Sequence, residues 1–274
     1  MNRKIKFNII SATIDSTSQV LNYIKHIKNA HQSHSNCIEL NLIIVDQFDS
    51  NREYIFLQEL PSLTYIHSNQ KGLSLNRNIG INQLKSNIYT FLDSDCEIDS
   101  TYFENFLSSF EEKNNNCMIY GSIKSTENKN INVFKKWPIR SKKFNTLEKW
   151  IYSTSVNIIY IGKPIYFDEH LGLGTYFGSC EDIDYALRFD KESFFNSNLH
   201  IYHPSQRFED INTQKVISYS RGYGALCRKH FSTISIFFFI SSIFYKIIKI
   251  KQKNIKKTLL SIKGRFQGFL KFKN

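Results

Sequence analysis

Apolar residues in the first half of the chain alternate between short continuous runs and stretches with helical spacing. The stretch after the first run, for example, has apolar residues at Val20, Ile24 and Ile27, which share one face of a helix. Such alternation is typical of an α/β protein whose mostly parallel central sheet is flanked by helices. The predicted strands are 7–10, 42–45, 63–66, 88–92 and 118–120, and the predicted helices are 16–29, 51–60, 73–84 and one that begins near residue 99 or 100.

Acidic side chains follow two of these strands. Asp46 comes after the second predicted strand, and Asp93 and Asp95 come after the fourth. Because ligands bind at the carboxyl ends of strands in an open α/β sheet, we expect these carboxylates to line a cleft. Two carboxylates one residue apart suit a hard divalent cation that also holds phosphate oxygens. An isolated Asp-x-Asp can equally cap the next helix or occupy a solvated turn.

A second acidic cluster lies later in the chain. Glu181 and Asp182 stand where a helix is predicted to begin, after the segment Phe167-Asp168-Glu169 and a glycine-rich loop. Acidic residues at a helix N-terminus need no function, because they complement the helix dipole. The loop, 172–178, superficially matches a dinucleotide fingerprint, but its third glycine comes one place too late and no strand leads cleanly into it.

Together these segments resemble glycosyltransferase family 2, whose nucleotide-sugar-binding fold is called GT-A. The resemblance covers about residues 5–210 and rests on ordered pieces at 9–15, 43–50, 69–80, 93–95 and 167–188. Two positions depart from the family pattern. Asn76 replaces the usual small residue before Arg-Asn, and Ser11-Ala12-Thr13 replaces the common Thr-Tyr-Asn type of opening. These departures bear on base and sugar preference rather than on the chemistry.

The resemblance implies a donor site in the first half of the chain. Asp15 and Asp46 would contact the uracil or other base, and Arg77 would meet the diphosphate or a neighbouring carboxylate. Asp93 would contact the ribose, and Asp95 would bind the Mn²⁺ or Mg²⁺ ion that bridges the two phosphates. Such a metal neutralises charge on the departing nucleoside diphosphate.

The resemblance also assigns the catalytic step. Asp182 would be the general base for the acceptor hydroxyl, and Glu181 would orient the acceptor, so that one displacement inverts the anomeric configuration. His203 stands where many GT-A enzymes place a histidine near the metal, although an isolated histidine is more often structural. The implied activity is inverting, metal-dependent hexosyl or N-acetylhexosaminyl transfer. Its donor is a nucleotide sugar, expected to be UDP-linked, and its acceptor a glycan of bacterial capsule, O-antigen or exopolysaccharide synthesis.

Charge is distributed unevenly along the chain. The formal net charge is +12, yet residues 211–274 contain 14 Lys and Arg and no Asp or Glu. Within this part, residues 231–245 form an uncharged, largely apolar segment that is shorter than the ~20 residues needed to span a bilayer. Basic residues on both sides of it are Arg228, Lys229, Lys246, Lys249, Lys251, Lys253, Lys256 and Lys257. This pattern favours a segment that lies on an anionic membrane surface, and the alternative is a buried C-terminal helix with a solvated basic end.

We therefore expect a GT-A catalytic domain at 1–210, with a nucleotide-binding part at about 1–121 and an acceptor-binding part at about 122–210. Residues 211–274 would form a basic, helical, membrane-associated extension. The Lys- and Asn-rich stretch 122–146 predicts an irregular loop. Five widely spaced cysteines without Cys-x-x-Cys favour the reducing cytosol, here the inner face of the cell membrane, where the glycan acceptor could be lipid-linked.

Rival functions remain open at this point. The chain could be an inactive GT-A-like protein that only binds a partner. Its basic end could bind nucleic acid, but no recognition motif supports that, and we expect no nucleic-acid partner. The Asp93–Asp95 segment also resembles haloacid-dehalogenase-like phosphatases, which carry this motif near the N-terminus and prefer Thr or Val where this chain has Glu97.

Overall fold

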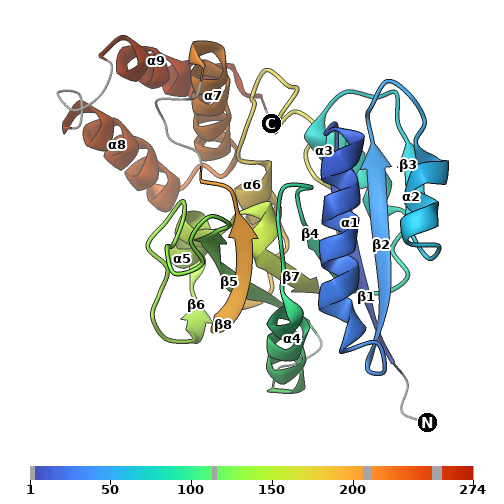
Figure 1. The fold of residues 1–274 in the computed structure, drawn as a ribbon. Helices are drawn as coiled ribbons and strands as arrows, with labels where there is room; N and C mark the ends of the chain where they lie inside the picture. Colours follow the sequence, from blue (N-terminus) through green and yellow to red (C-terminus); the bar gives the residue numbers. More distant parts are fainter. Residues whose placement is uncertain (1–3, 113–115, 206–211, 249–254, 274) are drawn as a thin grey trace. The chain divides into compact units, whose positions relative to one another are not determined.

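The computed structural model describes the chain except residues 1–3, 113–115, 206–211, 249–254 and 274 (Figure 1). The chain divides into two compact units. The first consists of Met1–Lys71, Asn76–Tyr166 and Ala186–Ser205, and the second of Gly72–Leu75, Phe167–Tyr185 and Gln206–Asn274. The predicted boundary between a catalytic domain at 1–210 and an extension at 211–274 stays a prediction. It falls among residues 206–211, which the structure does not describe.

The first unit is built on an eight-stranded sheet of order β3-β2-β1-β4-β7-β5-β8-β6. The strands are β1 (Ile5–Thr13), β2 (Ile38–Asp46), β3 (Thr64–His67), β4 (Ile88–Phe91), β5 (Cys117–Ser125), β6 (Lys142–Phe144), β7 (Ile158–Ile161) and β8 (Glu192–His203). The first four strands are all parallel, and β5 pairs with β8 in parallel too. β7 runs antiparallel to both β4 and β5, and β6 runs antiparallel to β8. The predicted α/β class with a mostly parallel sheet is confirmed.

Helices cover this sheet. They are α1 (Thr17–Gln32), α2 (Glu53–Glu59), α3 (Leu73–Ile81), α4 (Ser100–Glu112), α5 (Thr146–Tyr152) and the short 3₁₀ helix η1 (Ser155–Asn157). α1 begins where Ser16 and Gln19 form a reciprocal capping box, and its apolar face is buried. Phe7 of β1 contacts the rings of Phe103 and Phe106 on α4, edge to face. These contacts fix the layer of helices against the strands that carry the acidic residues.

The predicted strands and helices before residue 121 are present. The predicted irregular loop at 122–146 is wrong at both ends: residues 122–125 continue β5, because they pair with β8 beyond a register shift, and Lys142–Phe144 form β6, which also pairs with β8. The sequence pattern did not predict β7 or β8. β8 itself escaped prediction because polar residues, among them Asn196 and Asn198, interrupt its apolar alternation. This strand matters because His203 is its last residue.

The second unit is helical. It holds the start of α6 (Glu181–Arg188), followed by α7 (Thr213–Lys229), α8 (Thr233–Ile248) and α9 (Ile255–Lys271). α7 and α9 approach closely through small residues: the hydroxyls of Ser220 and Ser261 lie 2.6 Å apart, and a Cβ on Gly268 would lie 2.0 Å from the carbonyl oxygen of Arg221. None of the described helices combines the length and apolar composition needed to cross a bilayer.

Candidate active site

Strand register brings the acidic residues of the first unit together at the carboxyl ends of the parallel strands. Thr13 at the end of β1 pairs with Asp46 at the end of β2, and Asp93 follows the adjacent β4. The Thr13 hydroxyl lies 2.8 Å from the Ser94 hydroxyl and accepts the backbone N–H of Asp15 at 3.0 Å. The Ser94 hydroxyl in turn donates to the Asp15 carboxylate. Asp15 is thereby held against the turn that carries Asp93 and Asp95.

Arg77 of α3 fixes Asp93. Its guanidinium is 2% exposed and donates to the Asp93 carboxylate at 2.9 Å and to the Ser155 hydroxyl at 2.9 Å. Of the two contacts expected for Arg77, diphosphate or neighbouring carboxylate, the structure contains the second. Asp93 remains partly exposed and therefore accessible to a ligand. The unusual Asn76 is fully buried beside Arg77 and donates to the carbonyl of Gln70 at 2.8 Å, which holds the turn that leads into α3.

Asp95 and His203 face one another across the end of β8. The His203 Nε2 lies 3.5 Å from the Asp95 carboxylate, and its Nδ1 lies 2.8 Å from the Pro204 carbonyl oxygen. A carbonyl oxygen only accepts, so Nδ1 carries the hydrogen, and Nε2 is the ring nitrogen that faces Asp95. The ring also packs edge to face on Phe134, with 4.9 Å between centroids. This contact and the Pro204 bond orient His203.

Asp95, Cys96 and His203 form the one group of potential metal ligands found in the described parts of the chain, with donor atoms within 4.8 Å of one another. Burial raises the pKa of Asp95, the nearby Asp93 and Asp15 carboxylates raise it further, and His203 opposes them. Burial likewise raises the pKa of the Cys96 thiol well above its usual value. Cys96 is buried and its sulfur is a soft donor, whereas a hard divalent cation prefers oxygen ligands, so the Asp95 oxygens and the His203 nitrogen are the donors that suit such an ion.

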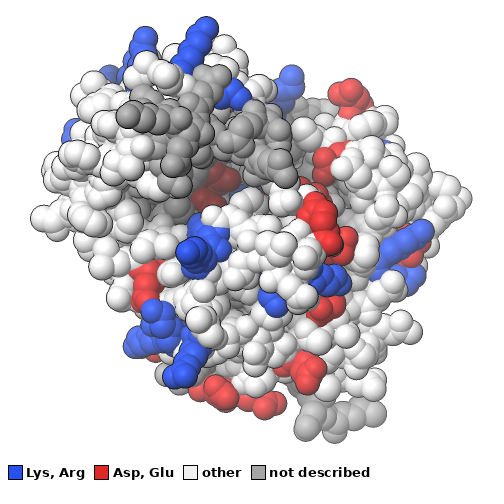
Figure 2. All heavy atoms as spheres, turned by 60° about the vertical axis from the view of Figure 1, so that its left-hand side comes forward, with Lys and Arg blue, Asp and Glu red and all other residues white. Residues whose placement is uncertain are grey.

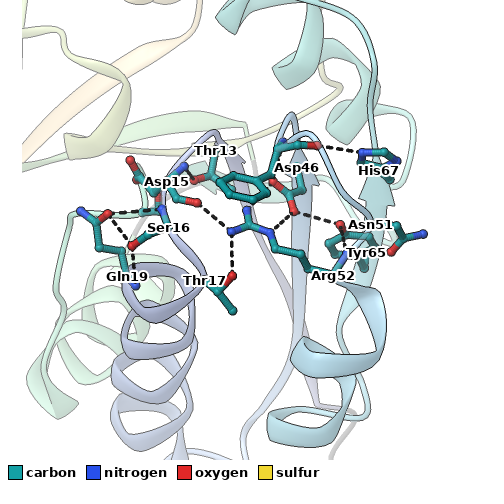
Figure 3. A network of polar contacts seen from close by, with 12 residues as sticks. Thr13, Asp15, Ser16, Thr17, Gln19, Asp46, Asn51, Arg52, Tyr65 and His67 are labelled. Atoms are coloured by element: carbon teal, nitrogen blue, oxygen red, sulfur yellow. Dashed lines mark hydrogen bonds and ion pairs between the residues drawn. The ribbon is translucent and has the colours of Figure 1, made fainter.

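Asp46 lies in a buried polar network (Figure 3). One of its oxygens accepts from the Arg52 guanidinium at 2.6 Å and from the Phe48 N–H at 3.0 Å. The other accepts from the Arg52 Nε and from the Tyr65 hydroxyl, each at 2.9 Å. The side chains of Asp46 and Arg52 are 0% and 3% exposed. The predicted contact between Asp46 and a base stays a prediction, and such a contact would compete with bonds that the carboxylate already makes.

Arg52 links this network to Asp15. Its guanidinium donates to the Asp15 carbonyl at 2.8 Å and to the Thr17 hydroxyl at 3.2 Å, so one side chain joins the ends of β1 and β2 (Figure 3). The guanidinium also stacks over the Phe48 ring, 3.9 Å from its centroid. Burial, aided by the hydrogen bond to Asp46, raises the pKa of Tyr65 to about 12.

Glu181 and Asp182 belong to the second unit, whereas the other predicted site residues belong to the first. Glu181 is buried at the first position of α6, and a Cβ on Gly172 would lie 3.2 Å from its carboxyl carbon. The Asp182 carboxylate accepts the N–H of Ile183 at 2.8 Å. Gly172 and Gly174 have φ angles of 104° and 90°, a backbone conformation that only glycine adopts without strain.

An ion-pair network anchors the helix that carries this acidic pair. Lys229 at the end of α7 lies 2.9 Å from the fully buried Asp184 on α6 and 2.6 Å from Asp168. His230 lies 2.9 Å from the same Asp184 carboxylate. The Phe-Asp-Glu segment, α6 and the end of α7 are thus joined within the second unit by charge pairs.

A protein-family model, glycosyl transferase family 2, matches residues 9–169. The chain belongs to this family. The match contains the β1, β2 and β4 ends and Arg77, and it ends at the Phe-Asp-Glu segment. No curated protein sequence matches the chain.

Solved structures similar to this family 2 chain include those of TarS from S. aureus. TarS 1-349 in complex with UDP-GlcNAc has a TM-score of 0.63 at 14% identity, over 97% of this chain and 82% of that one. The complex with UDP has a TM-score of 0.60 at 15% identity, over 98% and 76%. Another TarS 1-349 structure scores 0.60 at 15% identity, over 81% of this chain and 64% of that one, and this chain spans 44% of the longer TarS structure. The likeness confirms the GT-A type of fold.

Sequence reasoning missed three residues that contact the predicted site residues in this family 2 chain: Ser94, Arg52 and Ser155. Ser94 had a local signal, since it lies between Asp93 and Asp95, although its bond to Asp15 did not follow from that position. Arg52 lies six residues after Asp46, but no periodicity marks it as the buried partner. Ser155 reaches Arg77 across 78 residues, and one sequence offers no sign of such a contact.

Proposed function

We propose that this protein is an inverting, metal-dependent glycosyltransferase that moves a hexosyl or N-acetylhexosaminyl group from a UDP-linked donor to a hydroxyl of a glycan. One observation carries the proposal: Asp15, Asp93, Asp95 and His203 gather at one edge of the sheet in a family 2 chain. The UDP and UDP-GlcNAc complexes of TarS support the donor class.

Asp95 and His203 are the residues that would hold the metal. Their donor set, carboxylate oxygen and imidazole nitrogen, fits Mn²⁺ better than Mg²⁺, which prefers oxygen ligands alone. The hydrogen bond from His203 Nδ1 to Pro204 fixes the ring with Nε2 toward Asp95, the kind of support that orients ligating histidines. When bound, the ion would act as a Lewis acid that neutralises charge on the departing nucleoside diphosphate.

The remaining residues of the first unit would orient the nucleotide. Arg77, which also donates to the Ser155 hydroxyl, holds the Asp93 carboxylate, and this carboxylate would accept hydrogen bonds from the ribose hydroxyls. Ser94 and Thr13 hold Asp15 in the same way for the base. A site whose side chains are already fixed loses little conformational entropy when the donor binds.

Asp182 would take the proton of the acceptor hydroxyl as that oxygen bonds to the anomeric carbon and the bond to the diphosphate breaks. The N–H of Ile183 orients its carboxylate, and Glu181 beside it would hold the acceptor. Attack opposite the leaving group inverts the anomeric centre. We place this reaction in bacterial capsule, O-antigen or exopolysaccharide synthesis in the cytoplasm, and we propose no nucleic-acid partner.

The first experiment is a thermal-shift screen of UDP with Mn²⁺, with Mg²⁺ and with EDTA. We expect UDP to stabilise the protein only when a divalent metal is present. Asp95→Asn should abolish this metal-dependent stabilisation by UDP. Glu104→Gln, an exposed acidic position on α4, is the matched control and should behave as the wild type. UDP stabilisation that is equal in EDTA would contradict the metal assignment. Salt-sensitive binding to generic DNA without any UDP effect would favour the nucleic-acid alternative.

The second experiment measures sugar transfer or donor hydrolysis with a panel of nucleotide sugars. Asp182→Asn should lose roughly 10²–10⁴-fold in turnover, the scale of general-base catalysis, and should keep metal-dependent UDP binding. The product anomer should be inverted relative to the donor, as read by NMR. A fully active Asp182→Asn enzyme would remove Asp182 from the proposed role.

A further inference from the structure

The solvent side of α8 is apolar. Ser235 and Phe239 are buried, whereas Phe237 and Phe244 are 60% and 61% exposed. The other exposed apolar residues on that side are Ile236, Ile240, Ile247 and Ile248. A helical spacing of 100° per residue places this set on one side of the helix. α8 therefore presents to solvent a face that a water-soluble helix would normally fill with polar residues.

α9 has a similar outward face, interspersed with lysines. Ile255, Leu259, Phe266 and Leu270 are exposed, Leu270 at 77%, and Lys256 and Lys263 are exposed on the same side. The opposite side is the stripe of small residues that packs on α7, where Gly264 and Gly268 lie against α7 backbone. Because only that stripe permits the close approach, the orientation of α9 is fixed and its apolar residues must face outward.

α8 and α9 meet at Phe266. The buried Phe239 of α8 contacts the rings of Phe266 and Phe269 on α9, with centroids 5.4 and 5.0 Å apart, while Phe266 remains exposed. We call the combined face the α8–α9 surface. It consists of Ile236, Phe237, Ile240, Phe244, Ile247, Ile248, Ile255, Leu259, Phe266 and Leu270. Figure 2, turned so that the left-hand side of Figure 1 comes forward, shows blue Lys and Arg side chains at its upper edge.

The positive charge around the α8–α9 surface indicates which kind of partner the surface binds. Exposed apolar side chains in such number on two neighbouring helices mark an interaction site. No Asp or Glu occurs from residue 211 to the end of the chain, so the lysines on and around the surface belong to a region of one sign. A second copy of this surface would bring two positive faces together, which repel. Apolar side chains interspersed with lysines match an anionic bilayer, whose headgroups attract Lys while its interface takes up Phe, Leu and Ile.

We propose that the α8–α9 surface binds an anionic lipid bilayer, with its aromatic and aliphatic side chains in the interface and Lys256 and Lys263 at the lipid phosphates. The helices lie on the membrane and do not cross it. Lys249, Lys251 and Lys253, which the sequence pattern also assigns to the membrane side, lie outside the described residues and carry none of this argument. The proposal concerns membrane binding and is separate from the proposed sugar transfer.

The experiment is flotation of the full chain with vesicles of pure phosphatidylcholine or of phosphatidylcholine with 30% phosphatidylglycerol. Binding is expected to the anionic vesicles and to weaken with added salt. At about 1 kcal/mol for each lysine near the surface, the double variant Lys256→Gln/Lys263→Gln should bind roughly 30-fold more weakly. Lys25→Gln/Lys85→Gln, two exposed lysines of the first unit, is the charge-matched control and should bind as the wild type.

The apolar contribution is tested with Phe237→Ser/Phe244→Ser, which should weaken vesicle binding about tenfold or more. Tyr54→Ser/Ile139→Ser removes two apolar side chains of the first unit that are even more exposed, at 76% and 93%, and is the control. Equal melting temperatures of the variant and the wild type establish that the variant is folded. Equal binding to both vesicle types, or undiminished binding by both surface variants, would overturn the proposal. So would self-association in sedimentation velocity that Phe237→Ser/Phe244→Ser abolishes, because it would assign the surface to a second copy of the chain.

Discussion

Replacement of Arg52 by Met tests whether the buried pair with Asp46 stabilises the first unit. In the wild type the Asp46 carboxylate accepts four hydrogen bonds, and the substitution leaves two, from the Phe48 N–H and the Tyr65 hydroxyl. The bonds from Arg52 to the Asp15 carbonyl and Thr17 are lost as well. Removal of one partner of a buried pair costs about 3–5 kcal/mol, because the remaining charge stays in a low-dielectric site. Met retains much of the apolar packing on Phe48, so most of this loss is electrostatic.

Chemical and thermal unfolding measure the effect. At about 2–4 °C per kcal/mol for a chain of this size, we expect Tm to fall by roughly 6–20 °C. Lys28→Met is the matched control, since Lys28 and Glu59 form a more exposed pair at 3.1 Å, and such pairs contribute at most about 1 kcal/mol. The double variant Asp46→Leu/Arg52→Met should be more stable than Arg52→Met alone, because it removes the buried carboxylate that has lost its cationic partner. If Arg52→Met loses no more stability than Lys28→Met, the pair is dispensable and the reasoning fails.

Three further predictions concern stability. Lys229→Met should cost about 3–5 kcal/mol in urea unfolding, because it leaves the buried Asp184 and its neighbour Asp168 without their shared cation, and a loss below 1 kcal/mol would contradict this. Gly268→Ala should cost about 1–3 kcal/mol despite the better helix propensity of Ala, since its Cβ would meet the Arg221 carbonyl, and an unchanged Tm would refute that packing. The raised pKa of Tyr65 means that its stabilising effect is complete below pH 10, the unfolded pKa, and is lost as pH rises toward 12. The stability difference between wild type and Tyr65→Phe should therefore be constant from pH 7 to 9 and shrink above pH 10, and a difference independent of pH up to 11.5 would contradict the assignment.

Local pattern predicted much of the fold because the first half of the chain is regular. Buried parallel strands read as apolar runs, and α1 has both its apolar spacing and a Ser16 capping box in the sequence. β8 lacked that signal because polar residues interrupt it, and its pairing with β5 spans a register shift. Site residues at strand ends followed from the topology. Their partners did not, because Arg52 and Ser155 act through long-range or unpatterned contacts that only the folded chain specifies.

The contacts in the second unit also distinguish two kinds of basic residue, which contribute equally to the net charge. Lys229 pairs with Asp168 and Asp184, and Arg221 donates to Gln267 and stacks on Tyr176, so these cations hold the helices in place. Lys256 and Lys263 instead lie on the exposed side of α9, among apolar side chains. Loss of a cation of the first kind should lower stability, whereas loss of one of the second kind should weaken membrane binding and leave the melting temperature unchanged. Arg221 and Lys229 thus serve packing, and membrane binding is proposed only for Lys256 and Lys263 of α9.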